Sequence, residues 1–487
     1  MDLIFEKSRA DRRGYQLPEL DVPSRNPDDF IPADYLRRDA PDLPEISEID
    51  AVRHFTSLSK RNFGVESGTY PLGSCTMKYS PKINEDVTHI EKFENLHPLQ
   101  PEMTIQGALE LMYTMELLLC EITGMDNVCL HPAAGAHGEL LGLMLIKGWH
   151  NQKKDYERNT ILVPDSAHGT NLASATMLGY RVVEVKSNDR GLVDMNDFTE
   201  KANEHIACFM LTNPNTLGMF EENIIQISEQ IHGLGGLLYY DGANLNGIMG
   251  IVRPGDMGFD IVHLNLHKTF STPHGSGGPG SGPIGVKANL APYLPIPIII
   301  KTDTGYSLDY NRPFSVGQIR SFYGNFSVII KAYSYIISMG AEGLRSVCEN
   351  AVLNANYLLN MLKKNFFVPY DRTCKHEFVV SAIKQKMKGV SALDIAKRML
   401  DFGLHPPTMY FPLIVKEAMM FEPTETESKE NLDKLADVIA YINKEVCENP
   451  DIVRNAPHAT VIGRLDDVRA ARFPKLRYLK DEKILPV

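Results

Sequence analysis

The sequence predicts an α/β fold with a mostly parallel sheet in a large domain and a smaller C-terminal α+β domain. Strand-like and helix-like segments alternate from about residue 101 to about residue 290, which is the pattern of βαβ units. Five short apolar runs in this region end in polar or glycine-containing loops. Because ligands bind beyond the carboxyl ends of parallel strands, we expect these loops to meet at one site.

Three parts follow from the pattern along the chain. Residues 1–100 are expected to form an N-terminal extended arm and a helical segment, because the first 60 are rich in proline and charge. Residues 101–335 are expected to form the large domain and residues 336–487 the small one. Helices are expected at 105–122, 140–149, 326–340, 350–364 and 429–445, where apolar residues recur with helical spacing.

Composition indicates an ordinary globular enzyme. The chain has 487 residues, of which 43% are hydrophobic, and a formal net charge of -11, which argues against a nucleic-acid partner. Seven cysteines without a C-x-x-C pair favour a reduced, cytoplasmic location. The N-terminus does not resemble a signal sequence, and no apolar run is long enough for a membrane span. The histidines lack paired ligand spacing, so no metal is expected.

The most informative residue is Lys268, which follows the apolar run Asp260–Leu266 and precedes the glycine-rich loop 275–282. A lysine at a strand end, partly shielded from water, can supply the neutral amine that forms a Schiff base with an aldehyde. A surface lysine or an ion-pair partner is the alternative interpretation.

A second apolar run, Leu237–Tyr240, ends in Asp241, 27 positions before Lys268. Pyridoxal phosphate needs such a pair, with a lysine that holds its aldehyde and an aspartate that keeps its pyridine nitrogen protonated. The alternative for Asp241 is a turn or helix-capping residue.

Three more loops supply candidate cofactor contacts. Ala134, Gly135 and Ala136 precede a helix, so their backbone N–H groups are candidates to bind a phosphate, although close helix packing explains small residues equally well. The segment is neither a Walker loop nor a dinucleotide fingerprint. His168, at a strand-to-helix junction, is a candidate to stack on the cofactor ring, and Thr212 or Asn213 to bind its phenolic oxygen. The alternatives are a histidine satisfied by backbone groups and a structural β-turn.

Four motifs, in matching order, resemble the glycine decarboxylase (P-protein) family of the glycine cleavage system, and specifically the catalytic subunit of its two-chain form. They are residues 70–79 (YPLGSCTMKY), 263–275, 320–325 (RSFYGN) and 422–425 (EPTE). The resemblance implies the aspartate-aminotransferase type of fold, known as fold type I. It implies catalytic roles for Lys268, Asp241 and His168. The implied cofactor contacts are Ala134, Gly135, Ala136, His168, Thr212, Asn213, Asp241, Ala243, His267 and Lys268.

The resemblance also implies an activity, glycine dehydrogenase (aminomethyl-transferring). Glycine would lose carbon dioxide, and its aminomethyl group would pass to the lipoyl arm of the H-protein. Ser74, Cys75, Thr76 and Lys78 are candidates for the substrate channel, and His131 and His137 are weaker candidates for carboxylate binding or proton delivery. Cys75 could equally be an inert buried thiol.

The implied partner is a homologous subunit 1 without the lysine, in a heterodimer that pairs into an α2β2 tetramer. Residues 320–325 and the loop 275–282 are the expected interface, although packing within the chain would explain both. Two alternative functions remain open at this point. One is another enzyme of the same cofactor, such as an aminotransferase or a cysteine desulfurase, and the other is the non-catalytic half of a decarboxylase.

Overall fold

The computed structural model describes residues 2–39, 41–274 and 280–477. By its internal contacts the chain divides into two units, Met1–Ser67 and Gly68–Val487. The first unit contains η1 (Pro27–Asp29), η2 (Ala33–Tyr35) and α1 (Glu48–Ser59), which Ser47 caps at its N-terminus. Among the described residues of this unit only His54 is buried. The described residues of this unit therefore form no apolar core of their own.

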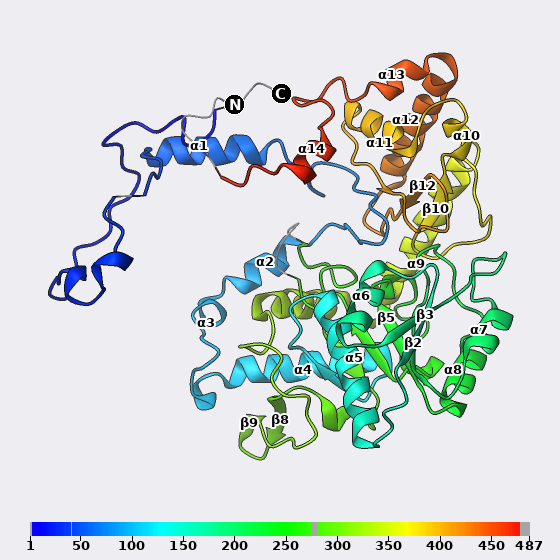
Figure 1. Cartoon of the computed structure of the whole chain (residues 1–487), viewed down its shortest axis with the longest axis horizontal. Coiled ribbons are helices and arrows are strands. Elements are labelled where there is room, and N and C mark those ends of the chain that lie inside the picture. Colours follow the sequence, from blue (N-terminus) through cyan, green and yellow to red (C-terminus); the bar gives the residue numbers. More distant parts are fainter. Residues whose placement is uncertain (1, 40, 275–279, 478–487) are drawn as a thin grey trace. The chain divides into compact units, whose positions relative to one another are not determined.

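The second unit is built on a seven-stranded sheet in the order β1-β7-β6-β5-β4-β2-β3. Strands β2, β3 and β5 of this sheet are labelled in Figure 1. Its strands are β1 (Asn127–Cys129), β2 (Thr160–Pro164), β3 (Arg181–Val185), β4 (Ile206–Thr212), β5 (Leu237–Gly242), β6 (Ile261–Leu264) and β7 (Ile284–Val286). The five neighbouring strands β3, β2, β4, β5 and β6 run parallel to one another. Strand β7 is antiparallel to both of its neighbours, β6 and β1. The predicted, mostly parallel sheet is confirmed.

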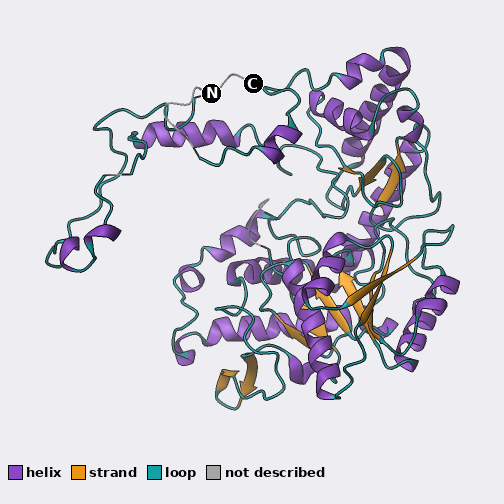
Figure 2. Cartoon of the chain, viewed as in Figure 1, coloured by secondary structure: helices purple, strands orange, loops and turns teal. Residues whose placement is uncertain are grey.

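Helices cover both faces of this sheet (Figure 2). On β5, Leu238 and Tyr240 pack into one cluster with side chains of α4 (Gln106–Thr123), α8 (Ile224–Gly233) and α9 (Phe326–Leu362). Tyr239 points to the other face, into a second cluster with side chains of α5 (Gly135–Gln152) and α6 (Gly169–Met177). Burial on both faces explains why β4 and β5 are continuous apolar runs in the sequence.

Shorter elements complete this part of the chain. They are α2 (Lys82–Thr88), α3 (Glu91–Glu94), η3 (Glu102–Thr104), α7 (Met195–Lys201), η4 (Leu245–Gly247), η5 (Pro254–Met257), η6 (Ala291–Tyr293) and the hairpin of β8 (Ile298–Thr302) and β9 (Gly305–Asp309). Among the described residues, no helix combines the length and apolar character needed to cross a membrane.

The C-terminal region has a three-stranded antiparallel sheet in the order β10-β12-β11, packed with helices. Its elements are β10 (Phe378–Ser381), α10 (Ile383–Lys386), α11 (Ala392–Asp401), β11 (Thr408–Met409), β12 (Ala418–Phe421), α12 (Lys429–Glu448), α13 (Pro450–Arg454) and α14 (Asp467–Arg472). The expected α+β character is confirmed.

The helix α9 joins the two regions and differs from the prediction in one respect. The sequence predicts separate helices at 326–340 and 350–364, whereas the structure has two helical stretches that meet directly at Gly340. Gly340 has φ 61° and ψ -179°, a conformation that only glycine adopts readily. A single glycine therefore connects the two helical stretches.

Candidate active site

A cavity of about 270 Å³ lies at the carboxyl ends of the parallel strands. The residues in its wall come from the loops after β1, β2, β4, β5 and β6 and from the segment before α2. They are Ser74, Cys75, Gly135, Ala136, Glu139, His168, Thr170, Thr212, Thr216, Asp241, Ala243, Asn244, Asn265, His267, Lys268 and His274. All five predicted loops contribute to it.

Lys268 lies in the turn that follows β6, between the buried side chains of Leu266 and Phe270. These two anchors explain why the half-buried lysine is held at the cavity wall. Its Nζ atom donates a hydrogen bond to the carbonyl oxygen of Ser74 at 2.8 Å. The amine is thereby oriented at a defined place in the wall. Residues 275–279 of the glycine-rich loop lie outside the described residues.

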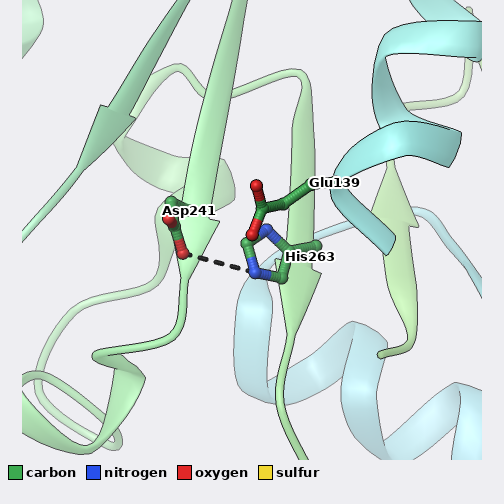
Figure 3. A group of neighbouring side chains, drawn as sticks. All are labelled: Glu139, Asp241 and His263. Carbon is green, nitrogen blue, oxygen red and sulfur yellow. Dashed lines mark ion pairs between the residues drawn. The ribbon is translucent and has the colours of Figure 1, made fainter. Parts of the chain in front are cut away.

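Asp241 is buried at the end of β5, and its Oδ1 atom accepts a hydrogen bond from the backbone N–H of Ala243. The same oxygen lies 3.3 Å from Nε2 of His263 on the neighbouring strand β6 (Figure 3). Burial acts to raise the pKa of Asp241, but His263, the Ala243 N–H and Lys268 outweigh it and hold that pKa below its usual range. Asp241 is therefore a carboxylate.

His263 is supported from behind by Tyr239, whose hydroxyl lies 2.8 Å from its Nδ1 atom. Burial lowers the pKa of His263, so the imidazole is neutral. A Tyr239 hydroxyl that donates to Nδ1 leaves the ring proton on Nε2, facing Asp241. Tyr239 thus orients the imidazole, whose Nε2 lies beside the carboxylate but makes no hydrogen bond among the described residues.

Glu139 is a second carboxyl beside Asp241, and Figure 3 shows both pointing toward His263. Burial and the neighbouring Asp241 raise the pKa of Glu139 to about 8, so this group is protonated at neutral pH. Thr170 donates to it, and the side-chain amide of Asn171, in the orientation that satisfies its hydrogen bonds, bridges Glu139 and Asp241. Carboxylate oxygens of Glu139 and Asp241 and a ring nitrogen of His263 lie within 4.8 Å of one another. The three groups are therefore close enough either to share a proton or to bind a cation.

The start of α5 faces the cavity through Gly135 and Ala136. Its N-cap, Ala134, is extended and offers no side-chain hydrogen bond, and the first backbone bond of the helix runs from Gly138 to Ala134. The N–H groups of the first turn are thus left for a ligand, and the helix dipole favours an anion there. A phosphate fits this position.

The predicted histidines His168 and His267 both lie in the cavity wall. His168 is the N-cap of α6, where its Nδ1 accepts the Thr170 N–H, and partial desolvation lowers its pKa. His267 precedes Lys268, and burial together with the charge of Lys268 lowers its pKa to about 4. Both rings are neutral at physiological pH, as stacking or hydrogen bonding to a cofactor requires.

Thr212 and Asn213, the two candidates after β4, have different environments. Thr212 is in the cavity wall, and its buried Oγ1 has no hydrogen-bond partner among the described residues. The side chain of Asn213 instead accepts the backbone N–H of Glu221 and is not in the wall. The structure therefore brings Thr212, rather than Asn213, to the site, and its free hydroxyl fits a polar atom of a ligand. Ala243 is in the wall.

The channel candidates separate in the same way. Ser74 and Cys75 are in the wall, whereas Thr76 donates to Glu422, and Lys78 is buried with its Nζ 2.7 Å from Glu425. Burial acts to lower the pKa of Lys78, but Glu425 and Tyr335 outweigh it and raise that pKa. Lys78 is thus a charged partner of Glu425 and does not reach the cavity.

His131 and His137, the weaker candidates, are also outside the cavity wall. Burial lowers the pKa of His131 to about 4, and His137 accepts the backbone N–H of Ala133 beside the start of α5. Neither is placed to contact a ligand in the cavity directly.

Six residues of the wall were not predicted from the sequence: Glu139, Thr170, Thr216, Asn244, Asn265 and His274. Helical spacing could have identified Glu139, because it lies four positions after Gly135 and therefore on the same face of α5. Asn265 follows β6 directly and Asn244 lies two positions after the end of β5, so their places in the loops were a usable indication.

Comparisons with protein families identify two matching regions. Residues 25–306 match the family model for the glycine cleavage system P-protein. Residues 347–458 match the model for the C-terminal domain of glycine dehydrogenase. Together these two regions contain all of the residues of the cavity wall and most of the C-terminal region.

Curated relatives match over nearly the whole chain. A probable glycine dehydrogenase (decarboxylating) subunit 2 of Caldanaerobacter subterraneus subsp. tengcongensis is 59% identical over 478 residues, which cover 98% of this chain and 99% of that protein. The protein of the same name from Bacillus cereus (strain B4264) is 60% identical over 478 residues, which cover 98% of this chain and 97% of that protein.

Solved structures share the fold. The inhibitor-bound crystal structure of a glycine decarboxylase (P-protein) of the glycine cleavage system has a TM-score of 0.73 at 20% identity, covering 85% of this chain and 94% of that one. A NifS-like protein has a TM-score of 0.61 at 14% identity, covering 77% of this chain and 99% of that one. The fold is that of fold type I pyridoxal phosphate enzymes, as predicted. By sequence over almost its full length, the chain belongs to the glycine cleavage system P-protein family.

Proposed function

We propose that this chain is the catalytic subunit of a two-subunit glycine decarboxylase, with pyridoxal phosphate bound covalently to Lys268. The observation that carries the proposal is the convergence of Lys268, Asp241 and the uncapped start of α5 on one cavity. The names of the curated relatives, glycine dehydrogenase (decarboxylating) subunit 2, support it.

The residues of the cavity fit the cofactor group by group. The N–H groups of Gly135 and Ala136 would hold the phosphate, with His267 as a neutral neighbour. The unpartnered hydroxyl of Thr212 would bind the phenolic oxygen. Asp241 would face the pyridine nitrogen, and His168 would stack on the ring.

When bound, pyridoxal phosphate supplies a ring that accepts the electrons of a bond broken at the substrate α-carbon. The chain's own contribution is electrostatic and positional. Asp241 keeps its negative charge because His263 and the Ala243 N–H hold its pKa low. Lys268 supplies the amine, and the carbonyl oxygen of Ser74 orients it by accepting a hydrogen bond from its Nζ atom.

Glycine is the proposed substrate, and a lipoyl disulfide on a carrier protein is the proposed acceptor. The carboxylate leaves as carbon dioxide, the α-carbon bonds to one sulfur as the S–S bond breaks, and the other sulfur takes up one proton. Ser74 and Cys75 would line the path of the lipoyl arm. Burial raises the pKa of Cys75, so it stays a thiol and does not compete for the disulfide.

The proposed partner is a homologous subunit 1, in a heterodimer that pairs into an α2β2 tetramer. The relatives' designation as subunit 2 supports a partner chain. The first unit offers a binding surface, because Tyr15, Leu17 and Leu20 are 78%, 84% and 74% exposed. Seven free cysteines fit the cytoplasmic location that we propose.

The test is glycine-dependent exchange of carbon dioxide, measured with the lipoylated carrier and with or without the partner subunit. We expect exchange only when chain, partner and carrier are combined. Full activity of the chain alone would contradict the two-subunit assignment. Release of sulfur from cysteine without glycine exchange would instead identify a desulfurase, a function that the shared fold permits.

A further inference from the structure

A second pair of carboxyl groups lies outside the wall of the active-site cavity, in the C-terminal region. Glu377 directly precedes β10 and Glu422 directly follows β12, and the adjoining residues Phe378 and Phe421 are cross-strand partners. Both glutamates are 0% exposed. Ligand atoms of His376, Glu377 and Glu422 lie within 4.8 Å of one another. The fold thus forces two carboxyls together away from water.

These carboxyls hold the segment that meets Lys268. Glu377 accepts the backbone N–H of Ser74 at 2.7 Å, and Glu422 accepts the hydroxyl of Thr76. Asn244 and Asn246, from the loop after β5, donate to Glu377 and Glu422 respectively. The loop 74–76 is therefore fastened to the C-terminal region and to the loop that follows Asp241.

These hydrogen bonds are needed because the backbone of the loop 74–76 has an unfavourable conformation. Ser74 has φ 63°, in the left-handed region that non-glycine residues rarely adopt. Further contacts from the small sheet reach Gly73, which donates through its N–H to Met420 and accepts through its carbonyl from Thr408. This strained backbone places the Ser74 carbonyl against the Lys268 amine.

If both glutamates were ionised, the groups around them would not balance their two negative charges. Burial lowers the pKa of His376 to about 3, so it is neutral, and neither of its ring nitrogens has a hydrogen-bond partner among the described residues. The cation that acts on both glutamates is Lys268, which also faces Asp241. The other titratable neighbours are the Cys75 thiol and Glu425, which is already paired with Lys78.

The hydrogen bonds leave one place for a proton. Both oxygens of Glu377 accept a donor, whereas Oε2 of Glu422 has no partner among the described residues. Burial raises the pKa of both carboxyls. Repulsion by Glu422 adds to this effect at Glu377, and repulsion by Glu425 adds to it at Glu422, whose pKa rises to about 7. Two buried carboxyls this close titrate as a unit.

We propose that Glu377 and Glu422 share a single proton and act together as positioning residues, which hold the loop 74–76 so that the Ser74 carbonyl meets Lys268. The catalytic meaning of this arrangement depends on the proposed function, because it is Lys268 that would carry the cofactor. One proton leaves one negative charge on the pair, enough to complement the lysine without two buried anions.

The first test counts protons by infrared spectroscopy of the purified chain freed of cofactor at pH 7 or slightly below. Protonated carboxyl groups absorb infrared light at a different frequency from carboxylates. Subtracting the spectrum of each variant from that of the parent isolates the contribution of the pair. We expect Glu377→Gln and Glu422→Gln each to lose one protonated-carboxyl band, because the remaining glutamate then ionises. The double variant should lose no more than either single variant.

Two spectroscopic results would overturn the shared proton. An unchanged band in both single variants means two carboxylates, with or without a bound cation. Twice the loss in the double variant means two protons. Glu445→Gln is the matched control, because Glu445 is also buried but is paired with Arg398 at 2.8 Å, and it should leave the band unchanged.

The second test follows the loop through Cys75, whose alkylation by iodoacetamide is measured by mass spectrometry. Glu377→Gln should react at nearly the parental rate, because its amide oxygen still accepts the Ser74 N–H. Glu377→Ala should react about tenfold faster or more, as expected from the loss of a hydrogen bond to a charged group. Equal rates for all three proteins would refute the positioning role. Since both tests use cofactor-free chain, they stand even if glycine exchange fails.

Discussion

Asp241 and His263 are cross-strand partners on β5 and β6, and the aspartate Oδ1 lies 3.3 Å from the imidazole Nε2. Register therefore fixes the contact, since any slip between the two parallel strands would move both side chains. Electrostatic interaction with His263 helps to hold the pKa of Asp241 low. If Asp241 controls the charge of the cofactor ring, its charge should matter more than its shape.

We predict that Asp241→Asn retains cofactor binding but slows glycine-dependent carbon dioxide exchange by several orders of magnitude. The variant nearly preserves the shape and removes the charge, which should raise the barrier by about 4 to 7 kcal/mol at roughly 1.4 kcal/mol per tenfold. Exchange rates of the parent and the variant, both loaded with cofactor, measure the effect. Turnover within about tenfold of the parent would refute the role of Asp241.

Gly135→Ala should weaken cofactor binding without unfolding the chain. A Cβ atom there would overlap Oδ1 of Asn265, so the start of α5 or the asparagine must move. We expect the dissociation constant for pyridoxal phosphate to rise by about tenfold or more, because the phosphate N–H groups shift with the helix. Gly107→Ala on α4, where no atom lies within 4 Å of the added Cβ, is the control and should bind normally. Normal binding by Gly135→Ala would exclude a phosphate at this position.

The buried pair Lys78–Glu425 is predicted to stabilise the fold rather than to bind substrate. The side chains are 1% and 9% exposed, so Lys78→Met would leave Glu425 buried without its charge partner. We expect a loss of about 3 to 5 kcal/mol in unfolding free energy, measured by urea denaturation. The exposed pair Lys429–Asp433 gives the control, since Lys429→Ala should leave stability nearly unchanged. A stable Lys78→Met chain with impaired glycine binding would reverse this assignment.

Glu139 predicts a pH dependence of stability in the cofactor-free chain. Its pKa is raised to about 8 in the folded state from an ordinary value of 4.5. Between these two pH values the folded chain therefore keeps a proton on Glu139 that the unfolded chain has lost. Stability should therefore fall as pH rises from about 4.5 to about 8, by up to about 1.4 kcal/mol per pH unit. Parallel unfolding curves of the parent and Glu139→Gln isolate this contribution. A stability difference that does not change with pH would show that Glu139 is ionised in the fold.

The sequence was sufficient to predict the parts of the site that depend on strand ends. Asp241 and Lys268 end adjacent apolar runs, and parallel strands bring their carboxyl ends to one edge whatever their order. The start of α5 was predictable for the same reason, because the small residues there lie in the loop that follows β1.

The remaining parts depend on contacts between distant segments. Ser74 meets Lys268 across 194 positions of sequence. Thr76 and Lys78 are drawn away from the cavity by Glu422 and Glu425, which no local pattern links to them. Periodicity predicts the two stretches of α9 but not that Gly340 joins them directly, because that depends on a single backbone conformation.

The central claim is the covalent role of Lys268, and borohydride reduction tests it most directly. The parent chain, loaded with pyridoxal phosphate, should show a visible absorption band that borohydride abolishes, leaving a reduced adduct on the peptide that contains Lys268. Lys268→Ala should show neither band nor adduct while it unfolds at nearly the parental temperature, because the half-buried side chain lines the cavity rather than the apolar core. A borohydride-reducible chromophore that persists on the folded Lys268→Ala chain would contradict the account.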